Sequence, residues 1–355
     1  MANSPVHFLV CLFVILAGGV ARAASSTDAG AEPPPQCQPV ISGVLWWLTP
    51  AAERPKLNAI LDAMEQAGMD TLWLLNTTRL AADPKDAFLE EIYSEADRRK
   101  WRVIIETSHV GDWYHRWDVP ALKEADRRHV ENVTRRYSRH PSFYGWYINY
   151  EIYMEWGEKS DKIRELYRHI GHLTRPATPG AKLTISPFFL ADQRQIRGNF
   201  RYASPEEYGR WWQETIRDAG IDIVMLQDSG AEHCECVDKT TRAAFFSAMK
   251  GACKANGAQL WGNVEMVEYR AKSWDEFARR LAEYRAAKVE YPWSFDMTRN
   301  AWKLNLASRY STRIVSWGWE FWNPVIPKEK VGNSRENYAT YLRYHRDVMR
   351  ASKNP

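Results

Sequence analysis

Two apolar stretches of the chain each run into an amide and then, two residues later, a glutamate. The first, residues 145–151, reads Gly-Trp-Tyr-Ile-Asn-Tyr-Glu, and the second, residues 260–265, reads Leu-Trp-Gly-Asn-Val-Glu. Two carboxylates facing each other across a cleft are the minimal equipment for cleaving a glycosidic bond. One must protonate the leaving oxygen, and the other must attack the sugar or activate water. Glu151 and Glu265 are therefore our candidate catalytic residues, provided that the fold brings them together.

The elements that must position these residues alternate regularly along the chain. Eight runs have the apolar or alternating pattern of strands, and each is followed by a segment of helical periodicity. The predicted strands are 39–48, 71–76, 101–107, 145–151, 182–186, 221–228, 259–265 and 313–320. The predicted helices are 52–67, 84–100, 120–139, 161–174, 205–219, 239–256, 274–288 and 335–352.

This alternation, without an internal repeat or a break in composition, predicts one (β/α)8 TIM barrel over residues 39–355. Residues 290–309 fit the pattern least well. They could form an inserted loop, or they could displace the eighth strand.

The carboxyl ends of barrel strands converge on one face, where the following loops carry the chemistry. Glu151 and Glu265 end the fourth and seventh predicted strands, on roughly opposite sides of that face. The other strand ends are rich in polar residues, which suit sugar hydroxyls, and in tryptophan, of which the chain has 17. Aromatic rings suit the apolar faces of sugars. We therefore predict substrate contacts from Trp46, Trp47, Asn76, Glu106, His109, Trp113, Tyr147, Asn149, Gln227, Asp228, Trp261, Asn263, Trp319 and Glu320.

Many of these residues also have an ordinary structural explanation. Glu106 and His109 could form a buried ion pair, and Asp228 begins an Asp-Ser-Gly sequence that is typical of turns. Individual tryptophans are more often core residues than sugar platforms. Glu268 competes with Glu265 for the catalytic role if the seventh strand ends later.

The pattern as a whole resembles the clan-A retaining glycoside hydrolases, and in particular secreted bacterial glycosidase-like barrels of unknown function. The resemblance spans about residues 39–350 and is carried by Glu151, by Glu265 and by Trp317-Gly-Trp on the last strand. It implies a retaining hydrolase of a poly- or oligosaccharide, without a cofactor. Glu151 would be the general acid/base and Glu265 the nucleophile.

One position departs from that family pattern. Tyr150 separates Asn149 from Glu151, whereas the family places asparagine directly before the acid/base glutamate. Because alternate residues of a strand share a face, Asn149 and Glu151 would still both address the cleft. This departure puts in question the hydrogen bond between that asparagine and a sugar hydroxyl.

The N-terminal sequence predicts export. Residues 9–20 are apolar and Ala21-Arg-Ala follows, which together indicate a signal peptide over residues 1–23. Residues 24–38 are rich in small residues and proline, and predict a flexible linker. The apolar core is too short to remain as a membrane helix, so we expect a periplasmic or extracellular protein without stable membrane insertion.

Charge and motifs exclude several function classes. The formal net charge is only +4, from 48 basic and 44 acidic residues, and no basic block suited to nucleic acid is present. Phosphate loops, dinucleotide-binding glycine motifs and serine-hydrolase elbows are also missing from the sequence. We expect a monomer that acts on a carbohydrate and needs no cofactor or metal.

After residue 23 the chain contains four cysteines, which are Cys37, Cys234, Cys236 and Cys253. In an oxidising compartment an even number of cysteines predicts two disulfides, with Cys234 and Cys236 each joined to one of the other two. A zinc site that includes His233 is less favoured, because the spacing is not that of a zinc ribbon.

Two other function classes remain open. A degenerate barrel could bind carbohydrate without cleaving it, since fold does not fix activity. A metal-dependent hydrolase would have to draw ligands from Glu106, His109, Asp228 and His233, whose spacing matches no metal-binding motif.

Overall fold

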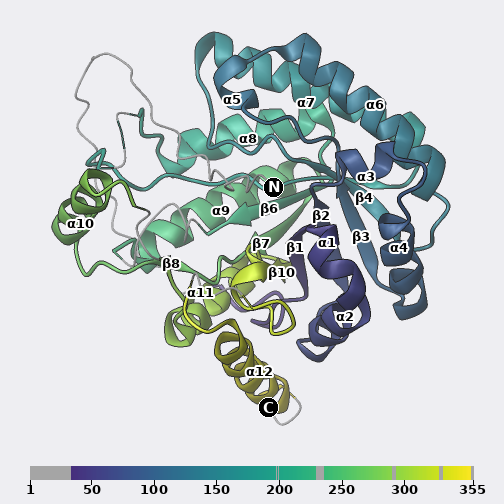
Figure 1. Cartoon of the computed structure of the whole chain (residues 1–355). Helices are drawn as coiled ribbons and strands as arrows, with labels where there is room; N and C mark the ends of the chain where they lie inside the picture. Colours follow the sequence, from purple (N-terminus) through teal and green to yellow (C-terminus); the bar gives the residue numbers. More distant parts are fainter. Residues whose placement is uncertain are drawn as a thin grey trace.

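The computed structural model describes residues 33–196, 198, 200–228, 236–289, 293–327 and 331–352, so the predicted signal peptide lies outside the described residues. Eight parallel strands form one sheet in the order β1-β2-β3-β4-β5-β6-β7-β10. A parallel bridge between Val44 and Ser316 joins the last strand to the first and closes the barrel (Figure 1). The predicted (β/α)8 fold is confirmed. The strands are β1 (Gly43–Trp47), β2 (Thr71–Leu75), β3 (Arg102–Glu106), β4 (Phe143–Ile148), β5 (Lys182–Ile185), β6 (Ile223–Gln227), β7 (Gln259–Asn263) and β10 (Arg313–Val315).

Helices surround the barrel and follow the strands along the chain (Figure 1). In the described part of the chain, no helix is both long enough and apolar enough to cross a bilayer. The helices are α1 (Pro50–Glu53), η1 (Arg54–Lys56), α2 (Leu57–Gln66), α3 (Thr78–Ala82), α4 (Phe88–Arg99), α5 (Trp113–Arg116), α6 (Val119–Tyr137), α7 (Gly157–Ala177), α8 (Pro205–Ala219), α9 (Lys239–Ala255), α10 (Trp274–Ala286), α11 (Met297–Tyr310), η2 (Trp319–Phe321) and α12 (Ser334–Ala351).

The segment between β7 and β10 differs from the prediction. The predicted helix 274–288 exists as α10, but α11 is the helix that packs on the barrel at this point. A side chain at Gly262 of β7 would place its Cβ 3.0 Å from the Cβ of Ala307, so α11 lies directly against the strand. The segment 290–309, which we considered as a loop or a displaced strand, therefore supplies the missing barrel helix in its described part.

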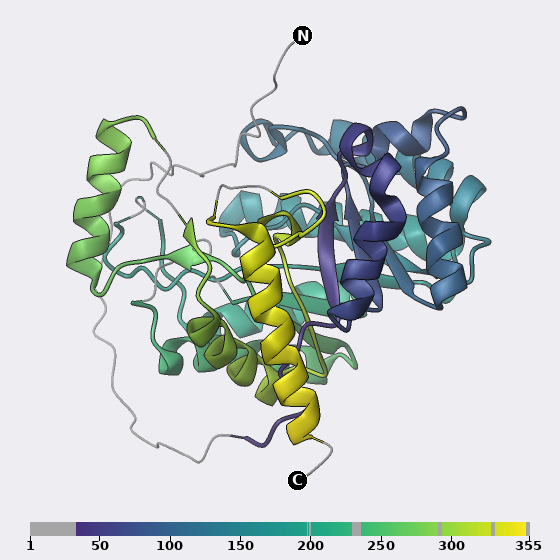
Figure 2. The ribbon, with the colours of Figure 1, turned by 60° about the horizontal axis from the view of Figure 1, so that its bottom comes forward.

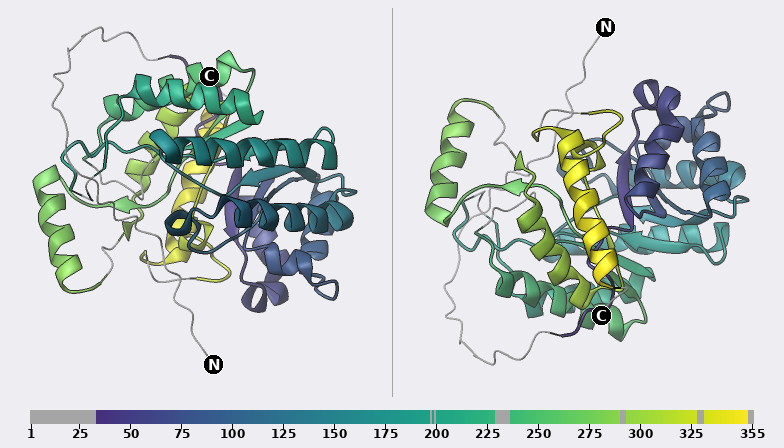
Figure 3. Two further views of the ribbon diagram at one scale, coloured as in Figure 1. Left: turned by 90° about the horizontal axis from the view of Figure 1, so that it is seen from above. Right: turned by 90° about the horizontal axis from the view of Figure 1, so that it is seen from below.

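Helix α10 belongs to an excursion from the barrel, which we define as residues 268–294 without the undescribed 290–292. It includes the short antiparallel strands β8 (Glu268–Tyr269) and β9 (Trp293–Ser294). Figures 2 and 3 show α10 standing away from the barrel in every view. Its buried residue Phe277 packs in a small apolar cluster with Tyr269 and Ala271, which Trp293 joins to the barrel core by packing against both.

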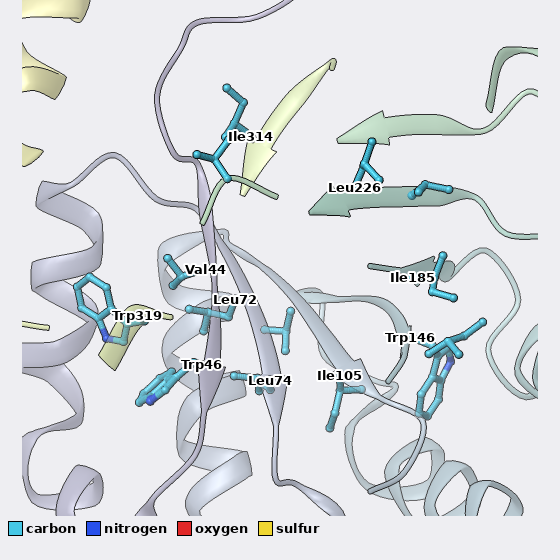
Figure 4. Packing of buried hydrophobic residues seen from close by; sticks show 14 of the residues in the cluster. Val44, Trp46, Leu72, Leu74, Ile105, Trp146, Ile185, Leu226, Ile314 and Trp319 are labelled. Atoms are coloured by element: carbon cyan, nitrogen blue, oxygen red, sulfur yellow. The ribbon is translucent and has the colours of Figure 1, made fainter. Parts of the chain in front are cut away.

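The alternation of side chains along each strand produces two apolar layers. The outer layer lies between sheet and helices, and Figure 4 shows part of it, including Leu72, Leu74 and Ile105. The inner layer fills the barrel with Leu45, Trp73, Leu75, Ile104, Tyr147, Ile223, Met225, Trp261 and Val315. Because the interior is filled, any substrate site must lie above it, at the carboxyl ends of the strands.

Candidate active site

The chain beyond β4 keeps the alternation of the strand. The side-chain amide of Asn149 lies 3.4 Å from Glu106 Oε2, and Glu151 contacts Tyr147 and Gln227 inside the barrel. Tyr150 points the other way, with its hydroxyl 3.0 Å from Asp126 Oδ1 and its ring fully buried. Asn149 and Glu151 therefore share the face toward the barrel mouth, as the spacing predicts.

Two donors hold the carboxylate of Glu151. The hydroxyl of Tyr147 donates to Oε1, and the amide of Gln227 donates to Oε2 at 2.8 Å. Burial, together with the negative charge of Glu151, raises the pKa of Tyr147 well above its usual value, so the phenol keeps its proton and remains a donor. A phenol can also accept a hydrogen bond, so Tyr147 can stay bonded to Glu151 in both protonation states.

Further hydrogen bonds tie this carboxylate to the neighbouring strands. Gln227 also donates to the carbonyl of Ser186 at 2.8 Å, and Asn263 donates to Ser186 Oγ at 3.0 Å. Asn263 Oδ1 in turn accepts the backbone N–H of Trp317 at 2.8 Å. A belt of bonds thus runs from β4 across β6 and β7 to the end of β10. Asn263 is fully buried and uses both ends of its amide in the belt, which does not fit its predicted contact with sugar.

Glu265 lies two residues beyond β7, and its backbone is anchored on both sides. Its N–H donates to Asp228 Oδ1 at 3.1 Å, and its carbonyl accepts from Lys303 Nζ. Asp228 is only 2% exposed and lies 3.5 Å from Arg242. Glu265 is equally buried, at 2% exposure. The contact of Asp228 with substrate stays a prediction, although its carboxylate already lies against cations within the fold.

Glu268, the alternative to Glu265, is also engaged. It lies on β8, 4% exposed, with Arg299 Nε at 2.7 Å and Arg242 at 3.3 Å. Burial alone would raise its pKa, but the charges of Lys303 and Arg242 and the hydrogen bond from Arg299 lower it overall. Glu268 is therefore an ionised structural partner of these cations.

Glu106 and Asn76 hold the loop after β2. Glu106 is fully buried and accepts from the N–H of Thr77 at 2.6 Å and from its hydroxyl at 2.9 Å, while burial raises its pKa. Asn76 has a left-handed backbone, with φ of 62°, and its amide donates to the carbonyl of Leu48 at 2.8 Å. Both side chains are used within the fold, so their predicted contacts with substrate are not supported. His109 is exposed, so it does not form the buried ion pair with Glu106 that we considered as an alternative, although its charge counteracts the rise in the pKa of Glu106.

Two of the predicted aromatic platforms lie on the wrong side of the sheet. Trp46 is 2% exposed and donates to Glu53 Oε1 at 2.8 Å, and Trp319 is 1% exposed and packs on Trp322. Figure 4 shows both rings in the outer layer beside β1. Both are core residues. For Trp46 on β1 the reason is that adjacent positions of a strand face opposite ways, whereas Trp319 lies on η2.

Two more are buried inside the barrel. Tyr147 packs edge-on against Trp73 at 4.6 Å between ring centres, and Trp261 stacks with Tyr144 and is 2% exposed. Neither ring presents a face to solvent. Tyr147 instead reaches the mouth through its hydroxyl, which binds Glu151.

The remaining predicted residues lie at the rim. Trp47 is 37% exposed and meets the exposed His109 edge-on at 5.2 Å. Trp113 on α5 is partly buried and packs against Tyr150 at 5.2 Å. Glu320 is partly exposed on η2. Trp47 is the best exposed of the predicted platforms.

The predicted disulfides through Cys37 and Cys253 are not formed. Both residues are free thiols, and burial raises the pKa of Cys37 to about 11 and that of Cys253 to about 12, so both keep their protons. The Sγ of Cys236 lies 3.0 Å from the carbonyl of Ala271. Cys234 and His233 lie outside the described residues. Within the described residues, no three histidine, cysteine or acidic side chains are grouped as metal ligands would be.

Sequence reasoning missed the polar groups behind the strand ends. Arg242 lies on α9 and Lys303 on α11, both among buried apolar residues such as Phe245 and Leu304. A charged residue at a buried helical position is the signal that could have marked them, because such a charge needs a partner. Asp126 on α6 is a third example.

The pKa of Asp126 predicts that the stability of the folded protein depends on pH. It accepts from Ser108 Oγ at 2.6 Å and from Tyr150, and burial raises its pKa to about 7, with a further contribution from Glu106. The ordinary value is 3.8, so between about pH 4 and pH 7 the folded protein holds a proton that the unfolded chain releases. The contribution of Asp126 to stability is therefore lost progressively as pH rises through this window.

We expect Asp126→Asn to remove this loss. Relative to the variant, the unfolding free energy of the unmodified protein should fall by a few kcal/mol between pH 5 and pH 8, since one pKa unit corresponds to about 1.4 kcal/mol. Urea unfolding of both proteins at the two pH values measures the difference. Asp161→Asn, at an exposed position of α7, is the control and should follow the unmodified protein. Parallel pH responses of Asp126→Asn and the unmodified protein would contradict the raised pKa.

Solved structures with this fold include several carbohydrate-active enzymes. A "putative alpha-L-fucosidase" from Bacteroides thetaiotaomicron is similar with a TM-score of 0.68 and 16% identity, over 93% of this chain and 99% of that one. An endo-1,4-beta-D-mannanase from Thermotoga petrophila gives 0.55 and 12% over 86% and 99%. A GH10 endoxylanase from a sugarcane soil metagenome gives 0.50 and 12% over 86% and 97%. The resemblance to glycoside hydrolase barrels is thus confirmed at the level of the fold.

Sequence comparison gives the family. No curated protein matches the chain at a significant level. A family model described as a domain of unknown function, DUF4434, matches residues 54–303, which is most of the barrel, from η1 into α11. The chain therefore belongs to the DUF4434 family.

Proposed function

We propose that this protein is an exported, monomeric glycoside hydrolase that cleaves a poly- or oligosaccharide with retention of configuration. Glu151 acts as general acid/base and Glu265 as nucleophile. The observation that carries the proposal is the placement of Glu151 at the barrel mouth, held by Tyr147 and Gln227. The fold is one on which such hydrolases are built, and Glu265 follows the strand that the clan-A resemblance assigns to the nucleophile.

The surroundings of the two carboxyls suit the two roles. Glu151 must lose and regain a proton in each cycle, and Tyr147 can bond to both of its states. Glu265 must stay ionised to attack, and its backbone is bound to Lys303 within a group of buried cations.

The test is incubation of the protein, without residues 1–23, with a panel of aryl glycosides and oligosaccharides. Release of product whose anomeric configuration, followed by NMR, initially matches the substrate supports the proposal. Inversion would overturn the nucleophile role of Glu265. Binding of oligosaccharides without turnover would instead support a carbohydrate-binding protein on a degenerate barrel.

Trp47 is the rim residue with the largest expected effect on substrate affinity. Trp47→Ala should raise KM roughly tenfold with little change in kcat, because stacking on an aromatic ring contributes about 1–1.5 kcal/mol. The matched control is Trp46→Phe, one residue earlier but buried on the other face. It should lower the melting temperature and leave KM unchanged. An unchanged KM for Trp47→Ala would place the substrate elsewhere.

A further inference from the structure

Four buried charged side chains lie beside Glu265. They are Asp228 after β6, Arg242 on α9, Glu268 on β8 and Lys303 on α11, and none is more than 4% exposed. We call them the buried charge cluster. Ions at this depth are costly unless each is paired, so the pairing decides what the cluster can do.

Each member of the cluster lies close to an ion of opposite sign. Asp228 Oδ2 lies 3.4 Å from Lys303 Nζ and 3.5 Å from Arg242, which also lies 3.3 Å from Glu268. Arg299, partly exposed at the edge of the cluster, binds Glu268 at 2.7 Å. In the described part of the chain, each of these two carboxylates thus lies between two cations. Although burial alone would raise the pKa of Glu268, the charges of Lys303 and Arg242 and the hydrogen bond from Arg299 lower it overall.

The same cluster forms hydrogen bonds to the backbone of Glu265. Asp228 accepts the N–H of Glu265 and Lys303 donates to its carbonyl. The carbonyl of Met266 accepts from Asn300 Nδ2 at 2.9 Å. The chain that follows β7 is thus fixed by side chains from α11 and from the end of β6.

We propose that Asp228 and Lys303 are positioning residues for Glu265, and that the ammonium group of Lys303 keeps the Glu265 carboxyl ionised. The inference rests on the proposed function, in which Glu265 must be ionised to attack the sugar. Lys303 donates a hydrogen bond to the backbone carbonyl of Glu265, so the ammonium group lies close to the side-chain carboxyl of the same residue. At such range, in surroundings poor in water, an opposite charge strongly favours the ionised form.

The experiment is a pH titration of the Glu265 carboxyl by NMR, in protein carrying 13C at the side-chain carboxyls of glutamate. The Glu265 signal is identified by its loss in Glu265→Gln. Lys303→Met should raise the titration midpoint by about one pH unit or more, because an opposite charge shifts a carboxyl by about 1–3 units. Asp228→Asn, which removes a negative charge but keeps an acceptor for the Glu265 N–H, should lower it.

The double variant Asp228→Asn with Lys303→Met restores the charge balance and should titrate close to the unmodified protein. It also covers the case in which Lys303→Met alone does not fold, since it leaves no unpaired Asp228. Arg99→Met is the control for a generic loss of a buried cation. Arg99 lies on α4, its side chain is 3% exposed and it pairs with Asp62. Arg99→Met should reduce stability without moving Glu265.

The inference would be overturned if removal of Lys303 did not change the titration midpoint of Glu265. The two comparisons are Lys303→Met against the unmodified protein, and the double variant against Asp228→Asn. An equal shift in Arg99→Met would also overturn the inference. The titration needs no substrate, so its result is separate from the test of hydrolysis. If glycosides are cleaved, Lys303→Met should lower kcat at least tenfold with little change in KM.

Discussion

Glu265→Gln will lower kcat for glycoside hydrolysis by roughly 10⁵-fold, because an amide of the same size cannot attack the sugar. Glu151→Gln will lower it by roughly 10²–10⁴-fold, which is the usual contribution of general acid/base catalysis. Steady-state kinetics on an aryl glycoside measures both values. The loss for Glu151→Gln should be smaller when the leaving group is an activated phenol, which departs without a proton.

Azide separates the two roles. In Glu151→Ala, azide should attack the glycosyl-enzyme in place of activated water and give a glycosyl azide of retained configuration. In Glu265→Ala, azide should attack the substrate directly and give the inverted azide. The reverse pattern would exchange the roles of the two residues.

The control for both variants is Glu155→Gln. Glu155 follows Glu151 in the same loop, is largely buried and accepts from Tyr114 at 2.8 Å, a bond that glutamine can preserve. Its kcat should stay within a few-fold of the unmodified protein. A loss in Glu155→Gln equal to that in Glu151→Gln would indicate damage to this loop instead of loss of a catalytic group.

Arg242→Met is the substitution with the largest expected effect on stability. It leaves Asp228 and Glu268 without their shared partner, and breaking a buried ion pair from one side costs about 3–5 kcal/mol. Urea unfolding near pH 7 measures the loss. The deficit should shrink in acid. The folded pKa of Glu268 is lowered below its ordinary 4.5, so the stability that its ion pairs contribute is present above that value and lost as pH falls through the folded pKa.

The control is Arg299→Met, which removes a partner from the same carboxylate. The side chain of Arg299 is 27% exposed, whereas that of Arg242 is 0% exposed. Water can replace part of the lost interaction at Arg299, so its substitution should cost less. An Arg242→Met loss below about 1 kcal/mol would mean that the cluster contributes little to folding.

The fold could be predicted from the sequence because period-2 and helical patterns are local and strong. Seven of the predicted helices lie where helices form on the barrel, but 274–288 marked the excursion and not the barrel helix. Helix α11 was missed because Pro292 and several aromatic residues precede it and its own residues carry a weak apolar face. Which of two successive helices packs on a strand depends on long-range contact, here between Gly262 and Ala307.

The placement of Glu151 was predictable, because strand alternation fixes its face once Asn149 is inside. The aromatic residues were less predictable. Trp46 and Trp47 are adjacent and chemically identical, and a shift of the strand by one residue would exchange their faces. Lys303 comes from a distant helix, so the sequence around Glu265 contains no pattern that predicts this partner.

The excursion around α10 is connected to the surroundings of Glu265 through its first residue. Its small apolar cluster touches the barrel core through Trp293, and much of the remaining excursion is exposed. Yet it begins at Glu268, which is bound to Arg242 and Arg299 beside the anchors of Glu265. We therefore expect a substitution that displaces Glu268 to disturb the ion pairs beside Glu265, the nucleophile in our proposal, without any change in the barrel strands.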